Sequence, residues 1–299
     1  MMADPAPPSI PAPAKINLYL HVTGKRPDGY HLLDSLIAFA GIQDRVSVAP
    51  ADGVSLTIEG PYGDDLKGTQ DDNLVLKAAR RLGAAAGTEA GADIRLDKRL
   101  PVASGIGGGS ADAAAALTGL SELWGVDGAG GPDLEKLALE LGADVPACLF
   151  GSAAFIGGIG EEIDRSPALP PAWLVLVNPG AVLSTPEVFA AREGEFSEPA
   201  RFDGAPESAR ALADILARRG NDLTAAAISL RPAIGDVVKV LEAADECLLA
   251  RMSGSGATCF GLFDDAGGAA RAAAVISQGR PEWWVRAAPL LDETRTLRT

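Results

Sequence analysis

The first extended stretch of the chain alternates between hydrophobic and polar residues. Over residues 15–23, apolar side chains occupy every second position and polar side chains fill the positions between them. A period of two places successive side chains on opposite faces of a strand, so we expect a β-strand with one buried and one polar face. The turn residues Pro27-Asp28-Gly29 then return the chain at Tyr30-His31, where a second short strand or a helix begins.

Periodicity and capping residues predict most of the other elements. Alternating runs at residues 45–48 and 54–59 flank Ala51-Asp52-Gly53 and predict a β-hairpin. A helix capped by Asp72-Asn73 is expected to end at Gly83. The remaining expected elements are helices at 111–120, 132–141, 211–218, 237–243 and 266–276, strands at 94–96, 173–177 and 284–287, and a glycine-rich turn leading into an apolar strand at 252–263.

This mixture of hairpins and helices predicts an α+β fold rather than a purely parallel sheet. Residues 161–171 mix charge and proline ahead of a continuous apolar strand, which indicates a domain boundary. We expect a flexible tail over residues 1–12, an N-terminal domain over 13–162 and a C-terminal domain over 163–299. The loop at 193–205 is expected to be exposed.

Charge and cysteine content narrow the function. The 299 residues include 40 acidic and 26 basic side chains, a formal charge of −14 that repels nucleic-acid backbones and anionic lipid surfaces. The expected partner is therefore a small molecule, with no nucleic acid and no membrane. Three cysteines without a Cys-x-x-Cys pair suggest no disulfide framework and fit a reducing cytoplasm. The sequence shows no apolar run long enough to predict a membrane span and no basic leader that would predict a signal peptide.

The densest glycine segment runs from Ser104 to Ser110, directly into an alanine-rich helix. Glycines let the backbone approach a ligand closely, and a helix start offers unpaired N–H groups to an anion, so the segment predicts a phosphate cradle. It matches neither the Walker A loop nor the dinucleotide fingerprint, because the Gly-Lys-Ser/Thr ending and the third glycine are missing. A flexible linker is the alternative. A second segment, residues 253–257, is either another backbone nest or a tight turn.

Lys15 and Asn17 share the polar face of the first predicted strand, which faces either solvent or a cleft. Asp144 follows a helix end and a glycine, a position that also suits a turn residue. If Lys15 and Asp144 meet in a cleft, the lysine keeps the carboxylate ionised and the pair can activate a substrate hydroxyl. Spacing alone leaves open whether they meet.

Together these segments resemble the GHMP small-molecule kinases. The N-terminal signature lies at residues 13–18 and 23–31, the ATP-phosphate loop at 100–114, the catalytic aspartate segment at 141–146 and the third motif at 252–257. The resemblance implies a two-domain GHMP fold with its active site in the interdomain cleft. Within the family, the first signature resembles the branch that phosphorylates the 2-hydroxyl of 4-diphosphocytidyl-2-C-methyl-D-erythritol with ATP, in the non-mevalonate route to isoprenoid precursors.

By this resemblance each matching residue acquires an expected role. Asp144 is the base and Lys15 orients and polarises the reacting centre. Substrate binding is expected at Asn17, Tyr30, His31, Thr185 and Phe189, with Tyr30 and Phe189 sandwiching the cytosine and His31 bonding its edge. ATP binding is expected at Asn73, Leu74, Pro101, Val102, Ala103, Ser104, Gly105, Ile106, Gly107, Gly108, Gly109, Ser110 and Ala111.

Mg²⁺ is expected with the ATP phosphates, and Ser110 is a candidate ligand. Relatives often carry more glycine where Ala103-Ser104 stands, so the entry to the loop is expected to be stiffer here, without loss of function. A monomer and a weak dimer both remain open. Two alternative functions remain. One is a homoserine or mevalonate kinase, and Tyr30-His31 and Phe189 argue against it. The other is a catalytically silent nucleotide-binding protein, and Lys15 and Asp144 argue against it.

Overall fold

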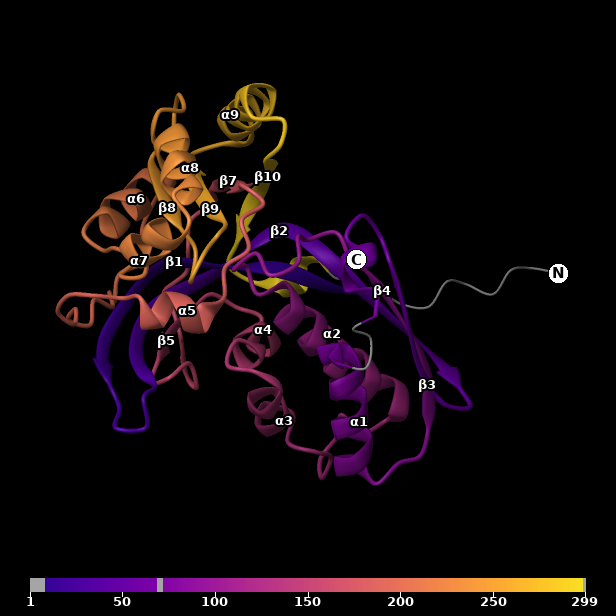
Figure 1. Cartoon of the computed structure of the whole chain (residues 1–299). Helices are drawn as coiled ribbons and strands as arrows, with labels where there is room; N and C mark the ends of the chain where they lie inside the picture. Colours follow the sequence, from indigo (N-terminus) through magenta and orange to yellow (C-terminus); the bar gives the residue numbers. More distant parts are fainter. Residues whose placement is uncertain (1–8, 69–71, 298–299) are drawn as a thin grey trace.

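The computed structural model describes residues 9–68 and 72–297. The strands are β1 (Ser9–Lys25), β2 (His31–Ala51), β3 (Val54–Glu59), β4 (Gly91–Asp97), β5 (Ala154–Gly157), β6 (Glu162–Arg165), β7 (Trp173–Asn178), β8 (Leu249–Met252), β9 (Cys259–Phe263) and β10 (Trp284–Leu291). The helices are α1 (Leu74–Ala86), α2 (Gly108–Trp124), α3 (Leu134–Leu141), α4 (Val145–Phe150), α5 (Thr185–Ala190), α6 (Ala209–Ala217), α7 (Thr224–Leu230), α8 (Ala233–Glu242) and α9 (Ala266–Gly279), with 3₁₀ turns η1 (Gly63–Leu66) and η3 (Thr294–Leu297). Helices α1 to α4 gather in one half of the molecule and α6 to α9 in the other (Figure 1). This mixed architecture confirms the α+β class.

Strands β1 and β2 form a long antiparallel hairpin that passes between the two groups of helices (Figure 1). Residues 9–12, predicted to be part of a flexible tail, instead begin β1 and pair with residues 44–47 of β2. Ile10 and Ala12 are buried there, so the apolar surface removed from water stabilises the pairing. The rest of the predicted tail, residues 1–8, lies outside the described residues.

The polar positions of β1 do not share one face as predicted, because the register with β2 shifts between Asn17 and Tyr19. Lys15 and Asn17 lie on the cleft face, whereas Tyr19 and His21 lie on the opposite face. Lys15, Asn17 and His21 are all largely hidden from solvent. Residues of the C-terminal half contact both faces: the Ser253 hydroxyl accepts the N–H of Asn17, and Nε2 of His21 accepts the N–H of Gly220. Polar side chains on β1 are therefore directed into the junction between the halves, where a site can form.

The predicted hairpin between residues 45–48 and 54–59 is wrong. Strand β4 lies between β2 and β3, antiparallel to β2 and parallel to β3. Gly91 permits this insertion, because a Cβ there would lie 2.3 Å from the carbonyl oxygen of Ala51. A period of two identifies a strand but carries no information about which strand pairs with it.

The alanine-rich helix α2 is the centre of the N-terminal helical layer. It packs against α1, β1 and β2 and buries most of its length, because small side chains allow close approach on several sides. The helix predicted to end at Gly83 continues to Ala86, and Gly87 then adopts a left-handed φ of +63°. Gly83 is accommodated inside the helix, so the first glycine in a run is not necessarily its end.

The C-terminal half is a sheet in the order β10-β7-β9-β8. Alternate residues of β7 serve two cores: Leu174 and Leu176 join the core that includes α6, whereas Val175 and Val177 join the core of α7 to α9. The end of β10 also pairs with β2, through residues 290–291, so both halves belong to one continuous sheet. The proposed division at 162/163 falls within β6, which pairs with β5.

Over residues 9–68 and 72–297, no helix combines the length and the apolar content that crossing a membrane requires.

Candidate active site

A cleft of about 950 Å³ opens where the two halves meet. Both halves line it, and it collects most of the residues predicted from sequence: Lys15, Asn17, Tyr30, His31, Asn73, Leu74, residues 101–105 and 107–110, Asp144, Thr185 and Phe189. Two predicted residues do not line it. The side chain of Ile106 is buried in the core, and Ala111 packs inside α2, where its N–H donates to the carbonyl of Gly107.

Lys15 and Asp144 do meet. The Lys15 ammonium donates a hydrogen bond of 2.8 Å to Oδ1 of Asp144. The Lys15 side chain is 6% exposed and the Asp144 side chain is 50% exposed, so the carboxylate reaches the cleft while the ammonium is sheltered behind it. Gly107 makes room for this lysine, since a Cβ at Gly107 would lie 3.3 Å from the Cβ of Lys15.

The predicted phosphate cradle has the expected geometry. Helix α2 begins at Gly108 immediately after Gly107, which takes a left-handed φ of +65°. The first-turn N–H groups of a helix have no intrahelical partner, and the macrodipole adds a partial positive charge there. Ala103 has a φ of +52°, which a non-glycine residue adopts at a conformational cost of order 1 kcal/mol. The loop entry that the sequence predicts to be stiffer therefore has a strained backbone at Ala103.

A buried ionic cluster supports the start of α2. The Lys98 ammonium donates to Asp112 at 2.7 Å and to Asp44, and Oδ1 of Asp44 accepts the N–H groups of Arg99 and Leu100. Burial raises the pKa of Asp112 to about 7 against the opposing effect of Lys98. Burial alone would lower the pKa of Lys98, but the carboxylates of Asp112 and Asp44 outweigh it and raise that pKa.

The second glycine segment is a turn between β8 and β9 that also braces the phosphate loop. A Cβ at Gly105 would lie 2.0 Å from the carbonyl oxygen of Gly256, so the two loops touch through their backbones. The N–H of Thr258 donates to the carbonyl of Ser104. On the opposite side, the hydroxyls of Ser255 and Thr185 lie 2.8 Å apart, which links this turn to the start of α5.

The predicted base-binding residues gather at the other end of the cleft. The rings of His31 and Phe189 stack with centroids 5.0 Å apart and planes 24° apart. Tyr30 is 61% exposed beside them. Burial, with the cations Lys25 and Arg192, lowers the pKa of His31, so its ring is neutral near pH 7 and offers one donor and one acceptor. The sandwich between Tyr30 and Phe189 stays a prediction.

Asn17 lines the cleft, and its side-chain amide has a fixed orientation. Its Nδ2 donates to the Ser35 hydroxyl at 2.9 Å, and that hydroxyl donates to the carbonyl of Tyr19. Oδ1 of Asn17 is buried, and no hydrogen-bond partner for it occurs among the described residues. An orphaned buried acceptor in a ligand cleft is suited to a donor from a bound molecule.

Sequence reasoning missed the Lys98 cluster and a second buried carboxylate, Asp34, which joins β2 to the loop after α5. A signal for the first was present, because Asp112 is a lone charge inside an alanine run that is otherwise apolar. No comparable signal marks Asp34, whose partners lie far along the chain.

Comparison with known proteins identifies the family. A family model of GHMP kinase N-terminal domains matches residues 73–152, and one of GHMP kinase C-terminal domains matches residues 201–280. The 4-diphosphocytidyl-2-C-methyl-D-erythritol kinase of Paramagnetospirillum magneticum is 54% identical over 284 residues, which cover 95% of this chain and 99% of that protein. A crystal structure of 4-(cytidine 5′-diphospho)-2C-methyl-D-erythritol kinase has a TM-score of 0.77 at 37% identity, covering 95% and 99% of the two chains. A homoserine kinase from Cytophaga hutchinsonii shares the fold alone, with a TM-score of 0.72 at 18% identity over 98% of each chain.

The fold and the cleft thus define a small-molecule kinase of the GHMP class, for which ATP is the phosphoryl donor. Within that class, the chain belongs to the family of the 4-diphosphocytidyl-2-C-methyl-D-erythritol kinases.

Proposed function

We propose that this chain transfers the γ-phosphoryl group of ATP to the 2-hydroxyl of 4-diphosphocytidyl-2-C-methyl-D-erythritol. The products are the 2-phosphate and ADP, and the step belongs to the non-mevalonate route to isoprenoid precursors. One observation carries the proposal: the Lys15–Asp144 pair lies in the same cleft as the glycine loop on one side and the His31–Phe189 stack on the other. A nucleotide phosphate and a base-bearing acceptor can therefore meet at this pair.

The chemistry assigned to the pair is general base catalysis with positioning. Asp144 accepts the proton of the 2-hydroxyl while the hydroxyl oxygen bonds to the γ-phosphorus and the bond from that phosphorus to the ADP oxygen breaks. Lys15 holds the carboxylate in place through the 2.8 Å hydrogen bond to its Oδ1. Oδ1 of Asn17 accepts a hydrogen bond from the methylerythritol moiety.

Cytosine recognition is assigned to the aromatic end of the cleft. The neutral His31 ring bonds the edge of the base, and Phe189 with Tyr30 covers its faces. Thr185, at the start of α5 beside Ser255, binds the same substrate. At the opposite end, Asn73 and Leu74 bind adenine. A substrate without a base leaves this aromatic end without a function.

We assign Mg²⁺ to the ATP phosphates. Across residues 9–68 and 72–297, no group of three His, Cys, Asp or Glu side chains could hold a metal. Mg²⁺ commonly keeps several waters and takes one or two protein oxygens with substrate phosphates, and the Ser110 hydroxyl at the first turn of α2 fits that role. When bound, the ion neutralises developing phosphate charge. The cytoplasmic location and the oligomeric state stay predictions.

Acceptor specificity tests the proposal directly. ADP release from Mg²⁺-ATP is measured with 4-diphosphocytidyl-2-C-methyl-D-erythritol, homoserine, mevalonate and no acceptor. We expect turnover with the cytidyl substrate alone. Turnover with homoserine or mevalonate instead would reject the cytosine site, and a folded protein silent with every acceptor would favour a nucleotide-binding role.

The base is tested by the isosteric change Asp144→Asn. Because the amide cannot accept the hydroxyl proton, kcat should fall by at least about 100-fold. Dissociation constants for a non-hydrolysable ATP analogue and for cytidine 5′-diphosphate should stay within about twofold, and Asp127→Asn in an exposed loop serves as the control. A variant that binds both ligands and turns over as fast as the parent would show that Asp144 is not the base.

A further inference from the structure

The two rings of the base-binding stack come from segments far apart in the chain. His31 is the first residue of β2, and Phe189 lies in α5, which is followed by the extended loop 191–205. No hydrogen bond between the described residues of β2 and α5 themselves accounts for the spacing of the rings. The contacts that join the two segments lie further along each of them, at Asp34 and at residues 197–201.

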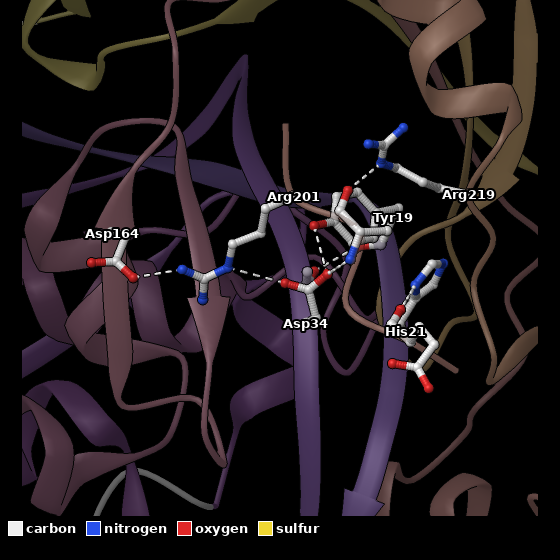
Figure 2. A network of polar contacts seen from close by, with 9 residues as sticks. Tyr19, His21, Asp34, Asp164, Arg201 and Arg219 are labelled. Atoms are coloured by element: carbon white, nitrogen blue, oxygen red, sulfur yellow. Dashed lines mark hydrogen bonds and ion pairs between the residues drawn. The ribbon is translucent and has the colours of Figure 1, made fainter. Parts of the chain in front are cut away.

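Asp34 is a buried carboxylate with three donors. It is 3% exposed; Oδ2 accepts the Tyr19 hydroxyl at 2.9 Å and the N–H of Ala200 at 2.7 Å. Oδ1 accepts Nε of Arg201 at 3.1 Å, and the same guanidinium donates to Asp164 at 2.6 Å. Figure 2 shows Arg201 lying between the two carboxylates, with Asp34 facing Tyr19. One buried side chain thus joins β2, β1 and the loop.

Neighbouring contacts hold the same loop against the hairpin. The N–H of Ser197 donates to the carbonyl of Val22, and Nδ1 of His21 lies 3.0 Å from the carbonyl oxygen of Glu198. Nε of Arg219 donates to the carbonyl of Ala200 (Figure 2). Between this region and α5, Arg192 donates to the carbonyls at residues 194 and 195, which keeps the intervening chain compact.

The face of the hairpin opposite Asp34 belongs to the cleft. Leu33 and Ser35, on either side of Asp34 in sequence, both line it. The Ser35 hydroxyl accepts a hydrogen bond from the Asn17 amide and donates one to the backbone carbonyl of Tyr19. The side-chain hydroxyl of the same tyrosine donates to Asp34. Tyr19 and Ser35 therefore connect Asp34, on one face of the hairpin, to the cleft on the other face.

We infer that Asp34 and Arg201 are positioning residues for the cytidine end of the substrate, acting by clamping the loop after α5 to the β1–β2 hairpin. The inference rests on the proposed function. The clamp sets the separation of His31 and Phe189 without touching the substrate, and it has no contact with the glycine loop. Its loss should weaken binding of the cytidine moiety and spare ATP.

The test measures two ground-state ligands by calorimetry: cytidine 5′-diphosphate for the base end and a non-hydrolysable ATP analogue for the other. Asp34→Asn keeps the shape of the side chain but replaces one acceptor oxygen by an NH₂ group, which then faces other hydrogen-bond donors. We expect the Kd for cytidine 5′-diphosphate to rise about tenfold or more, and the Kd for the ATP analogue to change less than about twofold. At saturating substrate, kcat should fall far less than KM for the cytidyl substrate rises.

Arg201→Gln is the second variant, because the side chain is 35% exposed and its removal is less disruptive to folding. It should weaken cytidine 5′-diphosphate in the same direction, Arg201→Lys should restore most of the affinity, and the Asp34→Asn/Arg201→Gln double variant should be no weaker than Asp34→Asn. Asp164→Asn, which leaves the Asp34 contacts intact, and Arg165→Gln, which removes the exposed pair with Glu293, are matched controls that should bind like the parent.

Unchanged cytidine 5′-diphosphate affinity in folded Asp34→Asn or Arg201→Gln would overturn the clamp, as would equal weakening of both ligands. If Asp34→Asn does not fold, the Arg201 variants decide the question by the same criteria. A parent protein that binds no cytidine 5′-diphosphate and phosphorylates another acceptor rejects the proposed function and this inference together. A parent that turns over the cytidyl substrate, with variants indistinguishable from it, rejects the clamp alone.

Discussion

Both lysines that are buried among the described residues, Lys15 and Lys98, are paired with carboxylates. A buried ammonium needs a partner, and Lys15 has one in Asp144, whose carboxylate remains half exposed to the cleft. Lys98 is deeper and is matched by two carboxylates, so its cluster carries one negative charge in excess unless Asp112 binds a proton. Burial raises the pKa of Asp112, and a proton held there removes that excess.

The pKa of Asp112 has a consequence for stability. Burial raises it from 3.8 to about 7, so between these pH values the folded protein holds a proton that the unfolded chain has released. The contribution of this group to the free energy of unfolding is therefore greatest below about pH 4 and declines as pH rises to about 7. Relative to Asp112→Asn, the parent should lose roughly 1 kcal/mol per pH unit across the window and nothing further above it.

Urea unfolding of both proteins, followed by circular dichroism between pH 4 and pH 8.5, measures this difference. Asp52→Asn, in an exposed turn, is the control for a change of carboxylate to amide away from the cluster. A parent that gains stability over Asp112→Asn on raising the pH would contradict the assignment of a protonated Asp112.

At the scale of elements, the active site depends on two glycine turns that lie against each other. The phosphate loop approaches the turn between β8 and β9 so closely that Gly105 cannot carry a Cβ without meeting the backbone of Gly256. Each turn is also joined to a helix at the cleft: the phosphate loop leads into α2, and Ser255 contacts Thr185 at the start of α5. Their contact couples the two ends of the cleft.

Gly105→Ala tests that contact. Gly105 has a φ of +75°, and an added Cβ would lie 2.0 Å from the carbonyl oxygen of Gly256, so either loop must shift. We expect the free energy of unfolding to fall by about 2–4 kcal/mol and KM for ATP to rise at least about tenfold. Gly53→Ala is the control, because its Cβ would meet no atom within 4 Å. Normal stability and ATP kinetics in Gly105→Ala would mean that the two loops can separate freely.

At the scale of the whole molecule, the two halves share a core. Ile16, Leu18 and Leu36 from the hairpin pack in one cluster with Leu174 and Leu212 from the C-terminal half. The end of β10 adds backbone pairing to β2. An interface that is both apolar and hydrogen-bonded favours cooperative unfolding of the parts that it joins.

We therefore expect one unfolding transition. Trp124 lies in α2, whereas Trp173, Trp283 and Trp284 lie in the C-terminal half. In urea, the tryptophan fluorescence of a Trp124→Phe variant, which reports the C-terminal half, should coincide with the far-ultraviolet circular dichroism of the whole chain. Two transitions with separate midpoints would show that the halves fold independently, as the division at 162/163 alone would suggest.

Helix ends and turns were predictable where a residue type sets the local backbone conformation. Asn73 caps α1 through its side chain, and glycines mark the turns around α2, because capping and left-handed backbone need no distant partner. Strand partners were not predictable in the same way: β4 enters between β2 and β3, and periodicity is identical for either pairing. For the same reason the sequence left open whether the polar side chains of β1 face solvent or a cleft, since their cover comes from residues some 200 positions away.

The sequence by itself determined the class of fold, the glycine turn ahead of α2 and, through its motifs, the family and most of the residues that line the cleft, because these depend on residue type and short spacing. Only the tertiary structure decided that Lys15 meets Asp144, that Lys98 is held between Asp44 and Asp112, and that Asp34 joins the hairpin to the loop after α5. These contacts depend on burial and on partners distant along the chain, and both arise when the two halves pack together.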